Sequence, residues 1–332
     1  MKSRALVVGI ALFCQTAMPA AATQPPPLTL SLAQALALSE RNNLDYQVAV
    51  QDVQVAQARV VQAGSALLPK IDLNYAYEHT QSAQTLAFAL PNGAGGTVVQ
   101  TIPLSATDTN AASAILQYVL YDGGADDARV GVAAAGYSAA QSELSAVRDT
   151  VQRDVTSAYF QLVEAQQAAT IADQSVAVAT QDVTTAEQLF AAGTAAKADV
   201  LRQRLSLAQA QSRQIAAHND VALANASLAN LLNVDLSSTI DPTEPLEAAP
   251  VEVNLQEALR TAQTDRPELR AAASATEIAK RTVALAEAGN FPVIAIDVEE
   301  SSVKPSLFGV PQPQLSATLS ATWHLFDGGL TR

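Results

Sequence analysis

Two periodicities of apolar residues follow one another along the chain. In residues 71–78 apolar and mostly polar side chains alternate, which is typical of a strand with one apolar and one polar face. From Ala125 to Phe190 apolar residues recur in steps of three and four, the pattern of a long coiled-coil helix. These 66 residues predict a rod roughly 100 Å long. Such a rod is too long for an ordinary globular domain.

The long helix is expected to turn and run back. Gly193 lies at the centre of a compact turn from Ala191 to Ala196, and apolar residues then recur at helical spacing as far as Leu232. A linker with three prolines follows between Asp235 and Pro250. The pattern predicts a helical hairpin over residues 125–232.

An internal repeat organises the chain. Residues 30–36 recur as residues 253–259, at an offset of 223, and Pro69 then aligns with Pro292. The turn Tyr121-Asp122-Gly123-Gly124 returns as Phe326-Asp327-Gly328-Gly329, at an offset of 205. In both copies short helices precede two alternating strands, so each copy predicts helices followed by a long β-hairpin.

The repeat divides the chain into three predicted regions. They are a signal peptide in residues 1–22, a first repeat in residues 23–245 and an incomplete second repeat in residues 246–332. The first repeat is expected to hold a β-hairpin over residues 70–121 and the helical hairpin over 125–232, and the second helices over 253–288 and a β-hairpin over 292–327. Turn-rich loops are expected at 91–96 and 305–313. The sequence stops at Arg332, where the first repeat continues into its helical hairpin, so we expect a truncated second repeat.

The N-terminus has the layout of a cleavable export signal. Lys2 and Arg4 precede an apolar stretch and a run of alanines that ends at Ala22. The only cysteine, Cys14, lies inside this segment, and the bulky Phe13 before it does not fit a lipoprotein signal. We expect an exported product without thiols, disulfides or a cysteine metal site.

Charge and composition narrow the function classes. The formal net charge is −13, which makes nucleic acid an improbable partner. No later segment has about 18 uncharged apolar residues in a row, so no membrane-spanning helix is expected.

The alternating strands predict a β-barrel to which several chains contribute strands. Four strands cannot close a barrel, because the smallest membrane barrels use about eight, and open strand edges are not tolerated in lipid. Three chains with four strands each would close one around a water-filled interior. Residues expected to line this pore are Asp72, Asn74, Asp297 and Glu299. Residues expected to face lipid are Ile71, Tyr75, Ile294, Ile296 and Trp323, the last in an interfacial aromatic belt rather than a soluble core.

Several loose motifs occur together in a specific order. Leu68-Pro69 and Phe291-Pro292 precede the first strand of each hairpin, an aromatic residue with Asp-Gly-Gly ends each hairpin, and Phe190-Ala191-Ala192-Gly193 is followed by Asp199-Val200-Leu201. In these features nearly the whole chain after the signal resembles the TolC family of outer-membrane efflux proteins.

The resemblance implies an α+β membrane protein with a long coiled-coil helical hairpin and transmembrane β-hairpins. It would be one protomer of a homotrimer with a 12-stranded β-barrel in the outer membrane of a Gram-negative bacterium and an α-helical barrel, the tunnel across the periplasm. The implied function is passive conduction in tripartite efflux or type I secretion, with cargo received from an inner-membrane transporter through a periplasmic adaptor protein. The adaptor would dock at a tip formed by Ala192, Gly193 and Thr194, and Asp199 would take part in closing the entrance.

Simpler interpretations stand beside these roles. Gly193 suits a helix-hairpin turn whether or not an adaptor docks there, and Asp199 could be a solvated carboxylate at a helix N-terminus. The turns at Asp122, Gly123 and Gly124 and at Asp327, Gly328 and Gly329 could suggest calcium loops, although the second copy lacks the extra carboxylates of the first, so strand-to-helix turns are the better interpretation. The histidines are scattered without ligand spacing, and we identify no cofactor site and no catalytic constellation.

The main rival is a soluble periplasmic coiled-coil protein, structural or adaptor, whose strands form a soluble sheet. An enzyme is less favoured still. The strands discriminate between the classes, because a soluble sheet would seldom carry two separate hairpins that each have a continuous apolar face.

Overall fold

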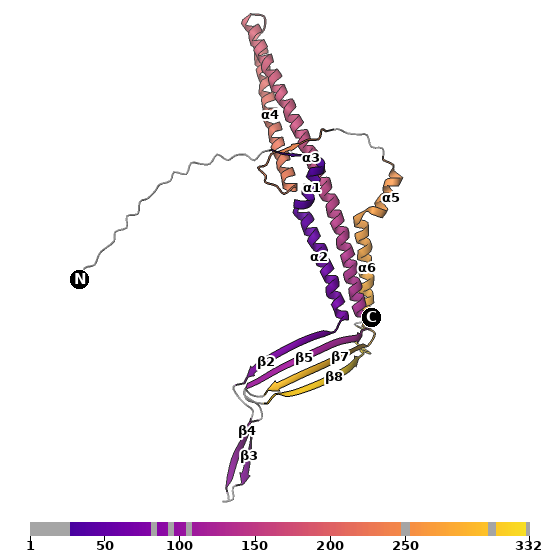
Figure 1. Ribbon diagram of the computed structural model, residues 1–332. Coiled ribbons are helices and arrows are strands. Elements are labelled where there is room, and N and C mark those ends of the chain that lie inside the picture. Colours follow the sequence, from indigo (N-terminus) through magenta and orange to yellow (C-terminus); the bar gives the residue numbers. More distant parts are fainter. Residues whose placement is uncertain are drawn as a thin grey trace, which may run out of the picture. The chain divides into compact units, whose positions relative to one another are not determined.

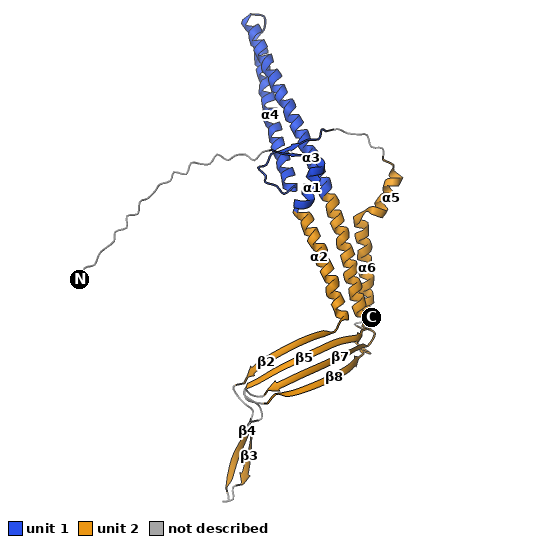
Figure 2. Ribbon diagram, viewed as in Figure 1, with its two compact units in different colours: residues 1–43, 151–249 blue, residues 44–150, 250–332 orange. Residues whose placement is uncertain are grey.

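The computed structural model describes residues 27–80, 85–91, 96–103, 108–246, 253–304 and 310–329. The expected signal peptide and most of the two expected turn-rich loops lie outside these residues. The chain forms two compact units, of which one comprises residues 1–43 and 151–249 and the other residues 44–150 and 250–332 (Figure 2).

The first unit is built on a pair of long helices. Helix α3 (Ala125–Ala191) enters this unit at residue 151, and α4 (Lys197–Leu231) runs back beside it (Figure 1). The short strands β1 (Leu28–Leu30) and β6 (Ile240–Pro242) pair in parallel, and α1 (Leu32–Asn42) begins at a capping box formed by Ser31 and Gln34.

The core of this unit gathers around Tyr159. Its side chain is fully buried, as are those of Leu162, Leu228 and Ile240. The Tyr159 hydroxyl donates a hydrogen bond to the carbonyl of Leu30 at 3.0 Å and accepts from two backbone N–H groups just after β6. This buried hydroxyl ties both short strands to α3.

The second unit combines helices with the main sheet. Helix α2 (Leu44–Gly64) continues into the 3-10 turn η1 (Ser65–Leu67), and Pro69 separates it from the strand that follows. The first part of α3 belongs here, together with α5 (Leu255–Asp265) and α6 (Pro267–Ala288), which are separated at Pro267. Pro267 is tolerated because it occupies the first turn of α6.

The main sheet has four antiparallel strands. In sequence order they are β2 (Lys70–His79), β5 (Asp108–Tyr121), β7 (Val293–Lys304) and β8 (Gln312–Thr322), and they keep that order in space (Figure 1). Strands β2 and β8 are therefore the two edges. The two edges come from different copies of the sequence repeat.

A separate hairpin between β2 and β5 differs from the sequence expectation. Strands β3 (Thr85–Pro91) and β4 (Thr97–Pro103) pair with each other, whereas we expected only a turn-rich loop near residues 91–96. The residues on either side of that turn are rich in β-branched and aromatic types, which favour strands. The sequence pattern predicted the turn but not its two strands.

The strand register reproduces the internal repeat. In the first hairpin Ile71 pairs with Leu116, and in the second Ile294 pairs with Ala321. These are equivalent pairs, because Ile294 follows Ile71 by 223 residues and Ala321 follows Leu116 by 205, the same offsets found in the sequence. The two hairpins are therefore structural copies of each other.

Candidate functional site

One face of the main sheet, which we call the polar face, carries all four residues predicted to line a pore. Residues paired directly across antiparallel strands lie on the same face. The register places Asp72, Ile115, Glu299 and Ser316 in one row across the sheet, and Asn74, Ser113, Ser301 and Gln314 in the next. Asp297 lies in the row on the other side, with Lys70, Gln117 and Thr318. These three rows thus bring three carboxylates and one ammonium group onto one surface.

The opposite face, which we call the apolar face, carries mainly aliphatic and aromatic residues. Its strand members are Ile71, Leu73, Tyr75, Ala112, Ala114, Leu116, Tyr118, Ile294, Ile296, Val298, Leu315, Ala317, Leu319 and Ala321. Many are exposed on the isolated chain, with Leu73 at 81% and Leu319 at 69%. Polar residues on this face include Glu300, Ser302 and Lys304 of β7, which are paired with Ala114, Ala112 and Asn110 of β5. A large exposed apolar surface marks an interaction site for protein or lipid.

Polar contacts border the apolar face at the end of the sheet where β2 ends and β5 begins. The Tyr75 hydroxyl donates to Asn110 Oδ1 and the Tyr77 hydroxyl to Asp108 Oδ1, each at 2.8 Å. His79 Nδ1 lies 2.6 Å from the same Asp108 oxygen. Tyrosines with an apolar ring and a hydrogen-bonded hydroxyl suit a boundary between an apolar and an aqueous phase.

The two Asp-Gly-Gly turns have nearly the same backbone. The φ angles are 72° at Gly123 and 86° at Gly124, and 72° at Gly328 and 90° at Gly329. These left-handed values favour glycine, because other residues lack the conformational freedom. The turn at Asp122 leads directly into α3.

Asp122 acts as the N-terminal cap of α3. Its Oδ1 accepts hydrogen bonds from the N–H groups of Gly124 at 3.0 Å and Ala125 at 3.1 Å, and its Oδ2 accepts from Asp126 at 2.6 Å. Asp327 accepts from the N–H of Gly329 at 3.0 Å in the same way. The carboxylates thus satisfy free backbone donors, which explains the motif without a metal ion. Among the described residues no cluster of three His, Cys, Asp or Glu side chains could hold one.

Gly123 also permits a close approach between the two repeats. A Cβ at this position would lie 2.7 Å from the Cβ of Phe291 and 2.8 Å from the carbonyl oxygen of Ala288. Gly131 plays a similar part, since a Cβ there would lie 2.9 Å from Arg281 Cδ. The sequence predicted a turn at Gly123 but not the residues that pack against it.

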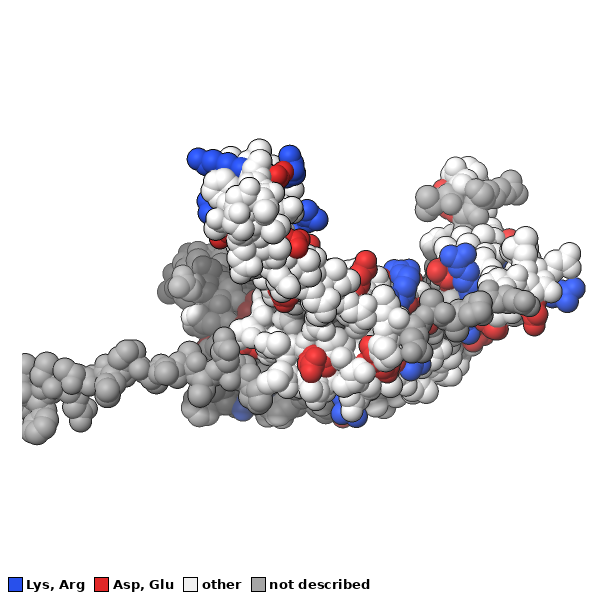
Figure 3. Space-filling view, turned by 90° about the horizontal axis from the view of Figure 1, so that it is seen from above, with Lys and Arg blue, Asp and Glu red and all other residues white. Residues whose placement is uncertain are grey.

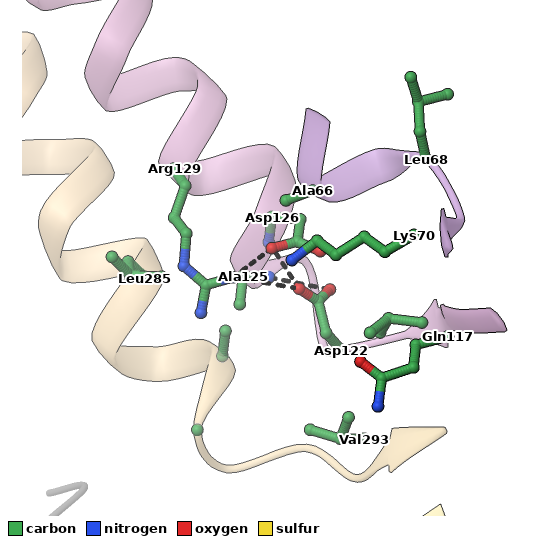
Figure 4. A pocket seen from close by; sticks show the side chains of 13 residues that line it. Ala66, Leu68, Lys70, Gln117, Asp122, Ala125, Asp126, Arg129, Leu285 and Val293 are labelled. Atoms are coloured by element: carbon green, nitrogen blue, oxygen red, sulfur yellow. Dashed lines mark hydrogen bonds and ion pairs between the residues drawn. The ribbon is translucent and has the colours of Figure 1, made fainter. Parts of the chain in front are cut away.

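A charged cavity of about 450 Å³ lies beside the first turn (Figure 4). Lys70 and Arg129 extend into it from opposite sides toward Asp122 and Asp126. The guanidinium of Arg129 pairs with Asp126 and lies 4.0 Å from Asp122. The wall includes apolar side chains from η1, β5, α3, α6 and β7 of the second unit. The sequence did not predict this grouping of Lys70 and Arg129, because their proximity depends on the fold.

The tip of the helical hairpin is a Schellman motif. Gly193 has a φ of 77°, its N–H donates to the carbonyl of Phe190 at 3.0 Å, and the N–H of Thr194 donates to the carbonyl of Leu189 at 2.9 Å. Ala192, Gly193 and Thr194 are all exposed. The structure therefore gives Gly193 the conformational role expected of it and leaves the tip accessible in this chain.

Asp199 lies in the first turn of α4. Its Oδ2 accepts from the N–H of Ala196 at 3.2 Å, and its Oδ1 accepts from Arg202 Nη1 at 2.8 Å. The side chain is 46% exposed. A carboxylate in this place caps the helix and interacts favourably with its dipole.

Polar pairs connect the two helices of the hairpin further along. Asp173 on α3 accepts from Gln214 Nε2 at 2.9 Å and contacts His218 Nε2 at 3.0 Å, both on α4. The hydrogen bond from Gln214, followed by that from His218, lowers the pKa of Asp173 below its usual value. The Arg204 guanidinium likewise meets Glu187 at 2.6 Å.

The surface charges are mixed. On the face drawn in Figure 3, Lys and Arg side chains stand among Asp and Glu side chains, and uncharged residues cover most of the visible surface. None of the helices in the described segments combines the length and apolarity needed to cross a membrane.

Comparisons with known proteins agree on one family. Residues 35–234 match the family described as outer membrane efflux protein. The protein CyaE of Bordetella pertussis is 29% identical over 225 residues, a region that covers 66% of this chain and 47% of CyaE. The chain thus spans about half the length of this curated relative.

Solved structures share the fold at low identity. A membrane protein from Pseudomonas aeruginosa superposes with a TM-score of 0.71 and 18% identity, covering 90% of this chain and 68% of that one. The CmeC outer membrane channel of Campylobacter jejuni superposes with a TM-score of 0.70 and 17% identity, covering 90% of this chain and 62% of that one. The outer membrane protein VceC of Vibrio cholerae superposes with a TM-score of 0.67 and 18% identity, covering 90% of this chain and 70% of that one. Together with the family match over more than half of its residues, these folds show that the chain belongs to the TolC-like family of outer membrane efflux proteins.

Proposed function

We propose that the chain is one protomer of a homotrimeric channel in the outer membrane of a Gram-negative bacterium, with an extension into the periplasm. The channel conducts efflux or secretion cargo passively. An inner-membrane transporter supplies the cargo through a periplasmic adaptor protein. Neither nucleic acid nor a cofactor takes part.

The observation that carries this proposal is the two-faced sheet with two unpaired edges. Within the described residues β2 and β8 each have a strand partner on one side only. Exposed, apolar edge strands of this length are a hazard for a soluble protein and are abolished when a barrel closes. Three such sheets supply twelve strands, which enclose an aqueous interior.

The dimensions of the apolar face fit a membrane. Along β8 and its continuation, apolar residues run from Pro313 to Trp323. Ten residue steps at about 3.3 Å span roughly 33 Å along the strand, and a tilt of about 40° reduces this to roughly 25 Å across the membrane. This is about the height of the apolar band of outer-membrane barrels. The polar contacts of Tyr77 and His79 then lie at the level of the lipid headgroups.

The polar face lines the pore in this arrangement. Asp72, Asp297 and Glu299 give it an acidic surface, with Asn74 beside them, and the combined negative charge of these carboxylates makes the lumen favourable for cations. The cavity with Lys70 and Arg129 opens on the same side, since Lys70 and Gln117 belong to the polar face. Cargo passing the sheet meets charges of both signs there.

We assign the remaining two sites by their place on the helical hairpin. Ala192, Gly193 and Thr194 form the adaptor-docking tip, supported by their exposure at the end of the hairpin. Asp199 contributes to closing the entrance, where its pairing with Arg202 can compete with links to a neighbouring helix.

Neighbouring cysteines on β7 test the orientation of the sheet. Cys14 is the chain's single cysteine and lies in the expected signal, so Ile296→Cys and Asp297→Cys each introduce one reporter thiol. In intact outer membranes a charged, membrane-impermeant thiol reagent should modify Asp297→Cys and spare Ile296→Cys, whereas a lipid-soluble reagent should modify Ile296→Cys. Equal modification of both by the charged reagent would favour a soluble sheet and contradict the proposal.

A further inference from the structure

The apolar face carries a polar notch on β7, formed by Glu300, Ser302 and Lys304. Elsewhere on β7 this face carries isoleucine and valine. Among the residues that the structure describes, no hydrogen bond or ion pair engages the side chain of Glu300 or Lys304. A charged side chain in a wall that faces lipid costs free energy, and such residues mark functional sites. The polar notch therefore calls for a partner outside the chain.

The polar notch crosses the boundary of the apolar band. Ser302 is paired with Pro313, where the apolar run of β8 begins. Glu300 lies two residues further into the band and Lys304 two residues outside it, roughly 7 Å along the strand in each direction. In a membrane a carboxylate thus lies just below the boundary and an ammonium group just above it.

This end of the sheet faces the outer leaflet in the proposed channel. Strand β7 ends here at Lys304 and β2 ends here at His79, whereas α2 and α3 connect to the other end of the sheet, through Lys70 and Tyr121. The helices extend into the periplasm in that channel. The polar notch therefore meets the lipids of the outer surface.

We propose that the polar notch binds a phosphorylated, acylated amino sugar of the outer leaflet, the chemistry of lipid A. This inference rests on the proposed channel and adds a specific lipid site to its outer wall. The Lys304 ammonium group pairs with a phosphate, and the Glu300 carboxylate accepts hydrogen bonds from groups that lie deeper in the same lipid.

The order of the two charges selects this class of lipid. An ionised carboxylate only accepts hydrogen bonds, so Glu300 needs donors below the level of the phosphate. In glycerophospholipids the groups below the phosphate are esters, which donate none. In an acylated amino sugar the amide N–H groups and the hydroxyls of hydroxyacyl chains lie there. Glu300 therefore gains partners from the glycolipid and stays unpaired beside a glycerophospholipid.

A hollow of about 360 Å³ beside the polar notch provides room for an acyl chain. Its lining comes from three successive rows of the sheet, of which the first and third lie on the apolar face. These two rows contribute Leu73, Ala114 and Glu300, and Tyr75, Ala112 and Ser302. The middle row points its side chains to the polar face and thus contributes backbone to the floor. The two small alanines of β5 leave space for the chain between the larger side chains of β2 and the polar notch.

The row of Lys304 adds a second donor at the level of the phosphate. Asn110 is paired with Lys304 across β5 and β7. Its Oδ1 accepts from the Tyr75 hydroxyl, which leaves Nδ2 to donate to a phosphate or sugar oxygen. The nearby Asp108 carboxylate is already engaged by two side chains of β2. The row thus presents donors to an anionic headgroup.

Lipid titrations of the full chain test the site. The protein, purified in detergent, is titrated with lipid A or with cardiolipin, a glycerophospholipid that also carries two phosphates, and bound lipid is counted by native mass spectrometry. The wild type should bind lipid A about tenfold more tightly, because hydrogen bonds to a charged group are worth that factor or more. Glu300→Ala should remove this preference by weakening the binding of lipid A alone. Lys304→Gln should weaken the binding of both lipids about fivefold, because each loses one phosphate contact.

The neighbouring Glu299 provides the matched control. It lies next to Glu300 on β7 but on the polar face, so Glu299→Ala removes the same charge without changing the polar notch. Lys280, an exposed lysine of α6, is the control for Lys304, and Lys280→Gln should leave both affinities unchanged. Fluorescence of Trp323 checks that each variant is folded.

Three outcomes are distinguishable. A preference for lipid A that is lost in Glu300→Ala and kept in Glu299→Ala supports the lipid site. Equal affinities of the wild type for the two lipids, equal losses in the two glutamate variants, or an unchanged affinity in Lys304→Gln would overturn the lipid site and leave the proposed channel standing. Recovery of the chain in detergent-free extracts without bound lipid would overturn both.

Discussion

Substitution of Gly123 by alanine tests how the two repeats pack. An alanine at a φ of 72° costs about 1–2 kcal/mol because the left-handed conformation brings its Cβ close to the following carbonyl. The new Cβ would also lie 2.8 Å from the carbonyl oxygen of Ala288, which is backbone and cannot rotate away. Such overpacking adds about 1–3 kcal/mol. We expect Gly123→Ala to destabilise the unit by about 2–5 kcal/mol.

Gly124→Ala is the matched control. Gly124 also has a positive φ, of 86°, but no described atom lies within 4 Å of the added Cβ, so only the backbone cost of about 1–2 kcal/mol remains. Guanidinium unfolding in detergent can be followed by Trp323, the only tryptophan, whose Nε1 donates to the carbonyl of Asn290 beside Phe291. Equal losses of unfolding free energy in the two variants would refute the packing argument.

Three further predictions concern the first unit. Tyr159→Phe removes a buried hydroxyl with three backbone partners and should lower the free energy of unfolding by about 1–3 kcal/mol, with faster hydrogen exchange near β1 and β6; unchanged exchange would contradict the role of this hydroxyl. Asp199→Ala should weaken the start of α4 by about 0.3–1 kcal/mol, and Asp199→Asn by less because an amide oxygen can still accept; a loss for asparagine as large as that for alanine would show that charge dominates over hydrogen bonding. Gln214→Ala should raise the pKa of Asp173 toward its usual value, as measured by carboxyl-carbon NMR, whereas the exposed control Gln211→Ala should not. Because folding lowers the pKa of Asp173, its ionised carboxylate stabilises the folded state above the unfolded pKa of 3.8, and this stabilisation is lost as the pH falls through the folded pKa. The free energy of unfolding of Gln214→Ala should therefore differ from that of wild type above this range and converge with it below.

The features that sequence predicted well are those that depend on local periodicity. Alternation in residues 71–78 is sufficient to separate Asp72 and Asn74 from Leu73 and Tyr75, because successive side chains of a strand point to opposite faces. The turn at Gly193 could also be predicted from the sequence, because few residues other than glycine adopt its backbone conformation.

The features that sequence missed depend on contacts between distant residues. Lys70 meets the Asp122 turn only because β2 pairs with β5, and Gly123 meets Phe291 only because the second repeat packs against the first. The strands β3 and β4 were overlooked because they are short and uncharged and flank a segment dominated by turn-forming residues. Adaptor docking and entrance closure stay predictions, since they concern surfaces completed by other chains.

Counting subunits tests the shared barrel most directly. Native mass spectrometry of the full chain, extracted from outer membranes in detergent and released from the micelle by collision, gives the number of copies in each particle. The two-faced sheet with free β2 and β8 edges predicts three copies that enter the membrane fraction together. A single copy recovered in detergent-free extract would contradict it.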